Sequence, residues 1–120
     1  MIGSLTTHVL DIAQGIPASQ VTIQVWRLHT RGEGRTLLKT MYTGEHGRTE
    51  EPLLTGNEFT AGTYELIFAV GAYFATQHIP TTDPPFLNDV PIRFSVTNPN
   101  THYHVPLLVS PWAYSTYRGS

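Results

Sequence analysis

The feature that most constrains this chain is a series of short β-prone runs separated by Gly, Pro, Asn and Asp, while helical periodicity is scarce. Runs of this kind that recur about every ten residues are typical of all-β proteins. In one of them Val21, Ile23 and Val25 alternate with other residues, which predicts a strand with one buried face. The chain is therefore predicted to be a β-sandwich.

Seven or eight strands and one short helix are predicted along the chain. The strands are expected at residues 5–10, 21–26, 36–43, 52–55, 63–70, 92–96, 102–109 and 112–118, and the helix at residues 71–78. Turns are expected at residues 31–34 and 44–48, where glycines and polar residues gather. Eight strands in two packed antiparallel sheets account for 120 residues, so residues 1–120 are expected to form a single domain.

The composition argues against several kinds of partner. Seven Lys and Arg residues against nine Asp and Glu give a net charge of −2 without a basic run, which disfavours nucleic acid. No apolar run reaches the roughly 20 residues needed to cross a bilayer. The first residues lack the charged start and apolar stretch of a signal peptide, so a cytoplasmic location is expected. The absence of cysteine excludes disulfides and thiol nucleophiles.

Three histidines lie inside predicted strands. Because side chains alternate along a strand, His8 is expected on the same face as Thr6 and Leu10, and His102 on the same face as His104. Imidazole titrates near neutral pH, which makes it the usual general base for activating water. Taken singly, each histidine fits a structural or surface role better than a catalytic one, but three strand histidines among six indicate a site.

Other chemistries have weaker support. His8, His102 and His104 could together bind zinc, although a spacing of two is a weak signal and no Cys or acidic motif accompanies it. Arg48 could present its planar guanidinium to carbonyl or carboxylate oxygens, or be a solvated turn residue. Ser115 and Ser120 lie outside a Gly-x-Ser-x-Gly motif, and glycine patterns for nucleotide cofactors are absent.

Aromatic residues in two regions allow alternative interpretations. Tyr73, Phe74 and Phe86 could face a ligand or pack the helix onto a sheet. Trp112 and Tyr114 could cover a subunit interface, where large aromatic residues are enriched, or belong to the core.

Five segments carry a resemblance to a known family, and they span nearly the whole chain. They are residues 5–11 (LTTHVLD), 59–66 (FTAGTYEL), 70–74 (VGAYF), 102–108 (HYHVPLL) and the ending 117–120 (YRGS). These segments resemble the 5-hydroxyisourate hydrolases, the transthyretin-related proteins of urate breakdown. The ending is the most specific of the five, because transthyretins proper share the fold and lack it.

The resemblance implies a transthyretin-like β-sandwich of two four-stranded antiparallel sheets with one short helix. It also implies a homotetramer with active sites at the interface between dimers. By the same resemblance, the catalytic residues are His8, Arg48, His104 and Ser120, and the residues that shape the substrate pocket are Tyr117, Arg118 and Gly119.

The implied reaction converts 5-hydroxyisourate to 2-oxo-4-hydroxy-4-carboxy-5-ureidoimidazoline without a metal or cofactor. One imidazole, of His8 or His104, would take a proton from water, and the other would orient that water or protonate the leaving nitrogen. Arg48 would stabilise the developing negative charge. The alternatives are a non-catalytic transthyretin-like protein that binds a small ligand, and a sandwich that only mediates protein contacts. A ligand channel would favour apolar residues where this chain has His8, Arg48 and His104.

Overall fold

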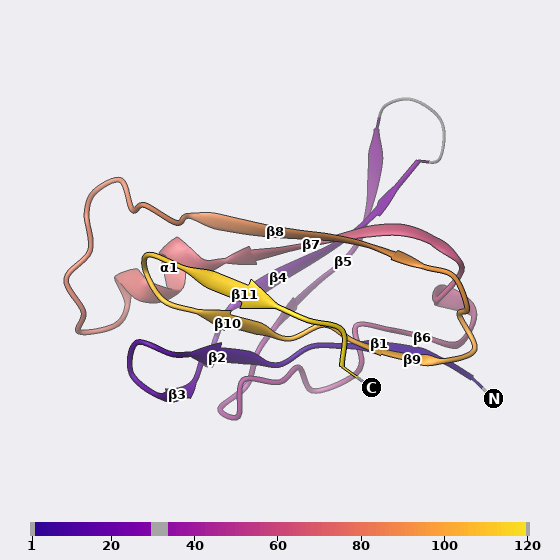
Figure 1. The fold of residues 1–120 in the computed structure, drawn as a ribbon, viewed down its shortest axis with the longest axis horizontal. Helices are drawn as coiled ribbons and strands as arrows, with labels where there is room; N and C mark the ends of the chain where they lie inside the picture. Colours follow the sequence, from indigo (N-terminus) through magenta and orange to yellow (C-terminus); the bar gives the residue numbers. More distant parts are fainter. Residues whose placement is uncertain (1, 30–33, 120) are drawn as a thin grey trace.

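A computed structural model describes residues 2–29 and 34–119 as two packed layers of β-strands with one short helix (Figure 1). The first layer is a four-stranded antiparallel sheet in the order β5-β4-β7-β8. Its strands are β4 (Thr22–Leu28), β5 (Arg35–Tyr42), β7 (Gly62–Ala69) and β8 (Asp89–Val96). The predicted turn at residues 31–34 lies outside the described residues except for Gly34.

The second layer consists of short strands that together occupy four side-by-side strand positions. Its strands are β1 (Ser4–Thr6), β2 (Val9–Asp11), β3 (Ile16–Pro17), β6 (Leu54–Thr55), β9 (His102–His104), β10 (Leu107–Val109) and β11 (Tyr114–Thr116). β1 and β2 follow one another along one position, and β9 and β10 along the next. β6 and β3 share the position on one side, and β11 occupies the other side.

The central pair of the second layer is parallel and keeps one register across an interruption. Ser4 is paired with His102 and Val9 with Leu107, at the same sequence offset. Across the interruption the N–H groups of Val105 and Leu107 still donate to the carbonyls of Thr6 and His8, at 2.9 and 3.0 Å. The hydroxyl of Thr7 donates to the carbonyl of Val105 at 2.7 Å and bridges this gap. The predicted strands at residues 5–10 and 102–109 are each therefore divided in two.

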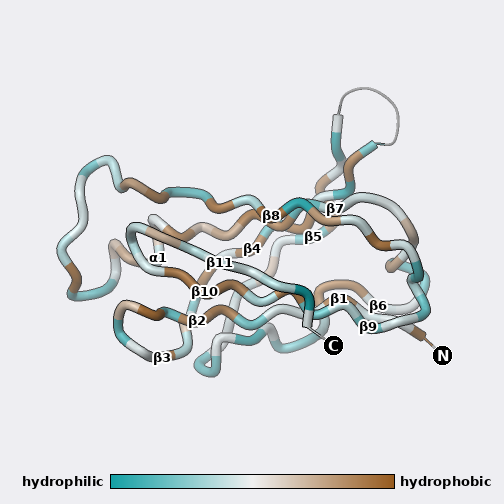
Figure 2. Tube along the Cα trace, in the orientation of Figure 1, coloured by the Kyte–Doolittle hydropathy of each residue, from teal (hydrophilic) through white to brown (hydrophobic). Residues whose placement is uncertain are grey.

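The buried core lies between the layers and confirms the predicted alternation. Val21, Ile23 and Val25 are buried, and Tyr64 and Phe68 of β7 are fully buried in the same cluster. In Figure 2 the hydrophobic residues concentrate along the strands of both layers, and the polar residues concentrate in the connecting turns. The predicted sandwich with one short helix is thus confirmed, with parallel pairing at the centre of the second layer.

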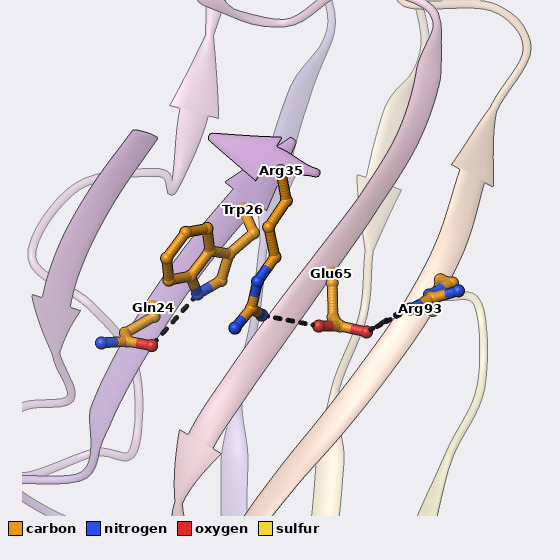
Figure 3. Close-up of polar contacts among 5 residues, drawn as sticks. All are labelled: Gln24, Trp26, Arg35, Glu65 and Arg93. Carbon is orange, nitrogen blue, oxygen red and sulfur yellow. Dashed lines mark hydrogen bonds and ion pairs between the residues drawn. The ribbon is translucent and has the colours of Figure 1, made fainter. Parts of the chain in front are cut away.

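The outer face of the first sheet carries a compact ion-pair network (Figure 3). Glu65 is only 8% exposed and accepts from Arg35 at 3.0 Å on one side. Arg93 donates to the other oxygen of the same carboxylate at 3.2 Å. The guanidinium of Arg35 also lies 4.0 Å from the centre of the Trp26 ring. Both carboxylate oxygens of Glu65 are thus paired with cations, on the opposite sheet from the histidines.

The helix α1 (Val70–Ala75) follows β7 directly and is shorter than the predicted segment 71–78. The N–H groups of Thr76 and Gln77 bond to the carbonyls three residues earlier, which closes the last turn. Tyr73 and Phe74 are buried, so they pack the helix onto the sheets. Among the described residues no helix is long and apolar enough to span a bilayer.

A buried carboxylate joins the end of β2 to this helix. Asp11 is 1% exposed and accepts hydrogen bonds from the backbone N–H groups of Ala13 and Gln14, each at 3.0 Å. Its other oxygen accepts from the hydroxyl of Tyr73 at 2.7 Å. A buried charge that is hydrogen-bonded in this way fixes the helix relative to the second sheet.

We expect Tyr73→Phe to lower the free energy of unfolding by about 2 kcal/mol, the usual value of one hydrogen bond to a charged group. The ring is retained, so the loss isolates the hydroxyl. Urea unfolding at a fixed protein concentration measures it. Tyr42→Phe is the matched control, because Tyr42 is 59% exposed. Equal stability of the two variants would contradict the proposed role of the bond between Tyr73 and Asp11.

Candidate active site

The predicted site residues gather on the outer face of the second sheet. Along β1 and β2 the buried positions are the odd-numbered ones, so Thr6 and His8 point outward. The register pairs Thr6 with His104 and Ser4 with His102, which brings both histidines to the same face. The predicted sharing of faces by Thr6 and His8, and by His102 and His104, is confirmed.

A chain of hydrogen bonds runs across β1 and β9 on this face. The Ser4 hydroxyl lies 2.6 Å from Nδ1 of His102. Nε2 of the same ring lies 3.1 Å from the Thr6 hydroxyl, which in turn lies 2.8 Å from Nδ1 of His104. The two imidazole rings are nearly parallel, with an angle of 11° between their planes. His104 is therefore held through Nδ1, and its Nε2 has no hydrogen-bond partner among the described residues.

His8 is oriented by the turn at residues 44–48. Its Nε2 lies 2.9 Å from the carbonyl oxygen of His46. A carbonyl only accepts, so Nε2 of His8 carries a hydrogen and the neutral ring has its lone pair on Nδ1. The backbone N–H of Val9 donates to the carbonyl of Gly47 at 2.8 Å and fixes the same turn against the strand. The turn thereby sets the tautomer of His8 and places Arg48 beside it.

Two glycines lie directly against the site histidines. Gly47 has φ of +77°, and a Cβ there would overlap the carbonyl oxygen of Val9 and lie 3.2 Å from Cδ2 of His8. Gly119 forms a β-bridge with His104, and its N–H donates to the His104 carbonyl at 2.7 Å. A Cβ on Gly119 would lie 2.9 Å from Cδ2 of the His104 ring. Only glycine allows the backbone to approach both rings so closely.

The histidines border an open depression of about 830 Å³. It is lined by His102, His104 and the C-terminal residues Tyr117, Arg118 and Gly119. The guanidinium of Arg118 lies 4.0 Å from the centre of the buried Tyr103 ring, which orients it at the wall of the depression. The segment that follows β11 thus returns to β1 and β9, as Figure 1 shows.

Arg48 lines a smaller depression of about 180 Å³ together with Thr6 and Thr7. Thr6 is bonded to His104, so the two depressions adjoin. The Arg48 side chain is exposed and forms no hydrogen bond or ion pair with the residues that the structure describes. Its guanidinium is therefore available to a bound molecule.

The electrostatics of the site keep both catalytic candidates neutral near pH 7. Burial lowers the pKa of His104 below the ordinary value of 6.5, and the charges of Arg48, His102 and His8 lower it further. Burial, followed by the charge of Arg48, also lowers the pKa of His8, against the opposing hydrogen bond to the carbonyl of His46. A neutral imidazole has a lone pair and can accept a proton.

The structure brings together six of the seven predicted site residues. His8, Arg48 and His104 interact electrostatically around Thr6, and Tyr117, Arg118 and Gly119 line the adjoining depression. Ser120 lies outside the described residues, and its role stays a prediction. Within residues 2–29 and 34–119, no group of three His, Cys, Asp or Glu side chains is arranged to hold a metal ion.

Sequence reasoning missed three contributors to the site. Thr6 was placed on the correct face, but its bonds to two histidines depend on the pairing of strands that lie far apart in the chain. His46 contributes through its backbone carbonyl, which leaves no signal in side-chain type. The sequence marks Gly47 only as a turn residue and does not show that its backbone lies against the His8 ring. The pattern His46-Gly47-Arg48 does mark the turn that orients His8.

Two packed β-layers, one short helix and an outward histidine cluster define a transthyretin-like β-sandwich with a polar site. The HIUase/Transthyretin family model matches residues 5–119 of this chain. The chain belongs to this family.

Curated and structural relatives agree with that assignment. The chain is 50% identical over 118 residues to 5-hydroxyisourate hydrolase 2 of Rhizobium meliloti (strain 1021), covering 98% of this chain and 97% of that protein. It superposes on (S)-allantoin synthase with a TM-score of 0.93 and 49% identity, covering 99% of this chain and 44% of that one. It superposes on sea bream transthyretin in complex with thyroxine with a TM-score of 0.84 and 31% identity, covering 97% and 94%.

We expect Arg48→Met to raise the pKa of both His8 and His104, because removal of the nearby positive charge makes protonation of each ring less costly. A proton NMR titration of the imidazole signals measures both values. Arg93→Met is the matched control, because Arg93 is paired with Glu65 on the other sheet. Unchanged pKa values in Arg48→Met would show that the guanidinium lies too far from the two rings to act on them.

Proposed function

We propose that this protein hydrolyses 5-hydroxyisourate to 2-oxo-4-hydroxy-4-carboxy-5-ureidoimidazoline, a step of urate degradation. The observation that carries the proposal is the convergence of two neutral imidazoles, His8 and His104, with the unpaired guanidinium of Arg48, in the part of the chain that the structure describes. The 50% identity to a protein named 5-hydroxyisourate hydrolase supports the substrate. We further propose that residues 1–120 act as a single hydrolase domain.

His104 is the general base in this mechanism. It borders the larger depression and has Nε2 free of protein partners among the described residues, so this nitrogen can take a proton from water as the oxygen attacks the acyl carbon. The same nitrogen then gives the proton to the leaving ring nitrogen when the tetrahedral intermediate collapses. His8 accepts a hydrogen bond from the attacking water at Nδ1, because its Nε2 hydrogen is engaged by His46.

The cations supply the electrostatic part of catalysis. Arg48 holds substrate oxygens in its planar fork and stabilises the negative charge that develops on the attacked carbonyl. Tyr117, Arg118 and Gly119 shape the depression that receives the polar heterocycle. Ser120 is proposed to act with them by analogy to the family. This scheme runs on side chains alone and uses no metal or cofactor.

A second candidate is a binding protein without catalysis. The similar sea bream protein was crystallised with thyroxine, which shows that this fold accommodates a ligand in a transthyretin. The outward face of the present chain favours the hydrolase, because it carries the half-buried His8 and His104 and the exposed Arg48. Polar groups of this kind suit a polar substrate better than an apolar ligand.

We also propose that the protein forms a homotetramer with sites at the interface between dimers. Large apolar side chains are exposed on the same layer of the sandwich, at the end formed by β2, β3 and the β10–β11 hairpin, namely Ile12, Ile16, Trp112 and Tyr114. A contiguous exposed apolar surface commonly marks a protein interface. A cytoplasmic location and the absence of nucleic acid and membrane partners stay predictions from the sequence.

The decisive experiment adds the purified protein to 5-hydroxyisourate that has just been generated from urate. We expect its ultraviolet absorbance to decay much faster than the spontaneous rate, and equally fast after exhaustive chelation. No acceleration at micromolar protein would favour the binding protein. Loss of activity on chelation with recovery on adding zinc would instead favour metal catalysis by the histidines.

We expect His104→Ala and Arg48→Ala to remain folded and to lose activity by about 10²-fold or more, the order expected for removing a general base or a charge-stabilising donor. The measurement is kcat/KM, with circular dichroism as the test of folding. His78→Ala is the matched control, since His78 is exposed in the loop after α1. A folded His104→Ala protein with near wild-type turnover would remove His104 from the mechanism.

The tetramer is tested by light scattering coupled to gel filtration. We expect four copies of the 13.4 kDa chain per particle. We also expect Ile16→Asp to give smaller species, because it places a charge in the apolar surface. Leu37→Asp on β5 is the matched control, since Leu37 is 43% exposed and Ile16 is 42% exposed. A monomeric wild-type protein would refute the proposed assembly.

A further inference from the structure

The Thr6 hydroxyl lies between two imidazole nitrogens. Its oxygen is 3.1 Å from Nε2 of His102 and 2.8 Å from Nδ1 of His104. A threonine hydroxyl has one hydrogen to donate and can accept through its lone pairs. If Thr6 donates to one ring and accepts from the other, both contacts are hydrogen bonds and the hydroxyl hydrogen is used, whereas accepting from both rings would leave that hydrogen without a partner among the described residues.

This single hydrogen links the tautomers of the two neutral rings. If Nε2 of His102 carries the hydrogen and donates to Thr6, the hydroxyl donates to Nδ1 of His104, and His104 then has its hydrogen on Nε2. If Thr6 donates to Nε2 of His102, Nδ1 of His104 donates to Thr6, and the lone pair of His104 is on Nε2. Only the second arrangement leaves the proposed catalytic nitrogen able to accept a proton.

The Ser4 hydroxyl can donate or accept, so it fits either arrangement, and the second is the one that the proposed general base requires. The hydroxyl lies 2.6 Å from Nδ1 of His102, the nitrogen that carries the hydrogen when Nε2 is an acceptor. Nδ1–H of His102 then donates to Ser4, the Thr6 hydroxyl donates to Nε2 of His102, and Nδ1–H of His104 donates to Thr6. Each hydroxyl and each ring nitrogen in this direction has a compatible partner.

We propose that His102 is a positioning residue that acts through Thr6 to hold His104 in the tautomer with its hydrogen on Nδ1 and its lone pair on Nε2. His102 acts on the tautomer of the base and does not itself touch the reacting atoms. The choice between the two arrangements and the kinetic part of this inference rest on the proposed function, in which His104 is the base, whereas the link between the two rings does not depend on the substrate.

Several charged groups face His104, and the experiment has to separate their effects from the hydrogen bond. Arg48 approaches from the turn at residues 44–48 and His8 from the adjacent strand, while His102 lies on the same strand. Tyr117 and Arg118 come from the C-terminal segment that lines the same depression. Any neutral replacement of His102 removes its effect on the pKa of His104, so two neutral replacements must be compared.

His102→Gln and His102→Asn form the matched pair. The glutamine amide reaches about as far as Nε2 and can accept from the Thr6 hydroxyl through its oxygen. The asparagine amide reaches only as far as Nδ1, so it keeps the contact with Ser4 and loses the one with Thr6. Both variants remove the same titratable ring from an exposed position, and only one breaks the link to His104.

The first measurement is the nitrogen NMR spectrum of the His104 ring at a pH where it is neutral. We expect the hydrogen on Nδ1 in the wild type and in His102→Gln. In His102→Asn the Thr6 hydroxyl has lost its acceptor at residue 102 and can donate to Nδ1 of His104, so we expect the tautomer with its hydrogen on Nε2 to become populated. Protonation of Nε2 in the neutral wild-type ring, or the same tautomer in both variants, would overturn the proposal, whether or not the protein hydrolyses 5-hydroxyisourate.

The second measurement is the pH profile of hydrolysis. We expect the acid limb of kcat/KM to move to higher pH in both variants, since each removes a group that lowers the pKa of His104. Only His102→Asn should also lose kcat on the plateau, by about tenfold with KM unchanged, as partners behind a functional histidine typically contribute.

His29→Asn is the control, because His29 makes an equivalent contact, with Nε2 2.9 Å from the Thr36 hydroxyl, at an exposed place in the other layer. It should leave kcat, KM and the pH profile unchanged. Equal plateau rates for His102→Gln and His102→Asn, in a preparation whose wild type is active, would refute a role for His102. An inactive wild type would refute the proposed function and leave the NMR result to decide the tautomer.

Discussion

The parallel pairing of residues 4–11 with residues 102–109 is the constraint on which the site depends. It brings Thr6 beside His104 and Ser4 beside His102, although these partners are separated by nearly the whole chain. The pairing is interrupted between the pairs Thr6–His104 and Val9–Leu107, where the hydroxyl of Thr7 donates to the carbonyl of Val105. A shift of one residue would reverse the faces of every side chain on the strand and remove the histidines from one another.

The two layers of the sandwich make different contributions. The β5-β4-β7-β8 sheet supplies most of the fully buried aromatic core and carries its charges as a closed network in which Glu65 is bonded to Arg35 and Arg93. On the second layer Arg48 forms no such ion pair with the residues described, and the neighbouring imidazoles have lowered pKa values. The paired charges hold the strands of the first layer together, whereas Arg48, without such a partner among the described residues, is the cation that the proposed mechanism uses to stabilise negative charge.

Much of this arrangement could be predicted from sequence, and the remainder depends on contacts between distant segments. The alternation of Val21, Ile23 and Val25 predicts a strand with one buried face because it is a local pattern. The shared face of Thr6 and His8 follows from the same period of two. The bond between Thr6 and His104 could not be predicted, because it depends on the register of two strands that no local pattern specifies.

The close approach of Gly47 to His8 and of Gly119 to His104 has a consequence for how the family can vary. On the side of these glycines each imidazole is backed by main chain, so no side chain on that side can be exchanged to adjust the ring. Substitution of these two glycines is limited by the close contacts that a Cβ would make and by the φ of +77° at Gly47, independently of any chemical role. A saturation library scored for activity would therefore tolerate as few substitutions at Gly47 and Gly119 as at core positions.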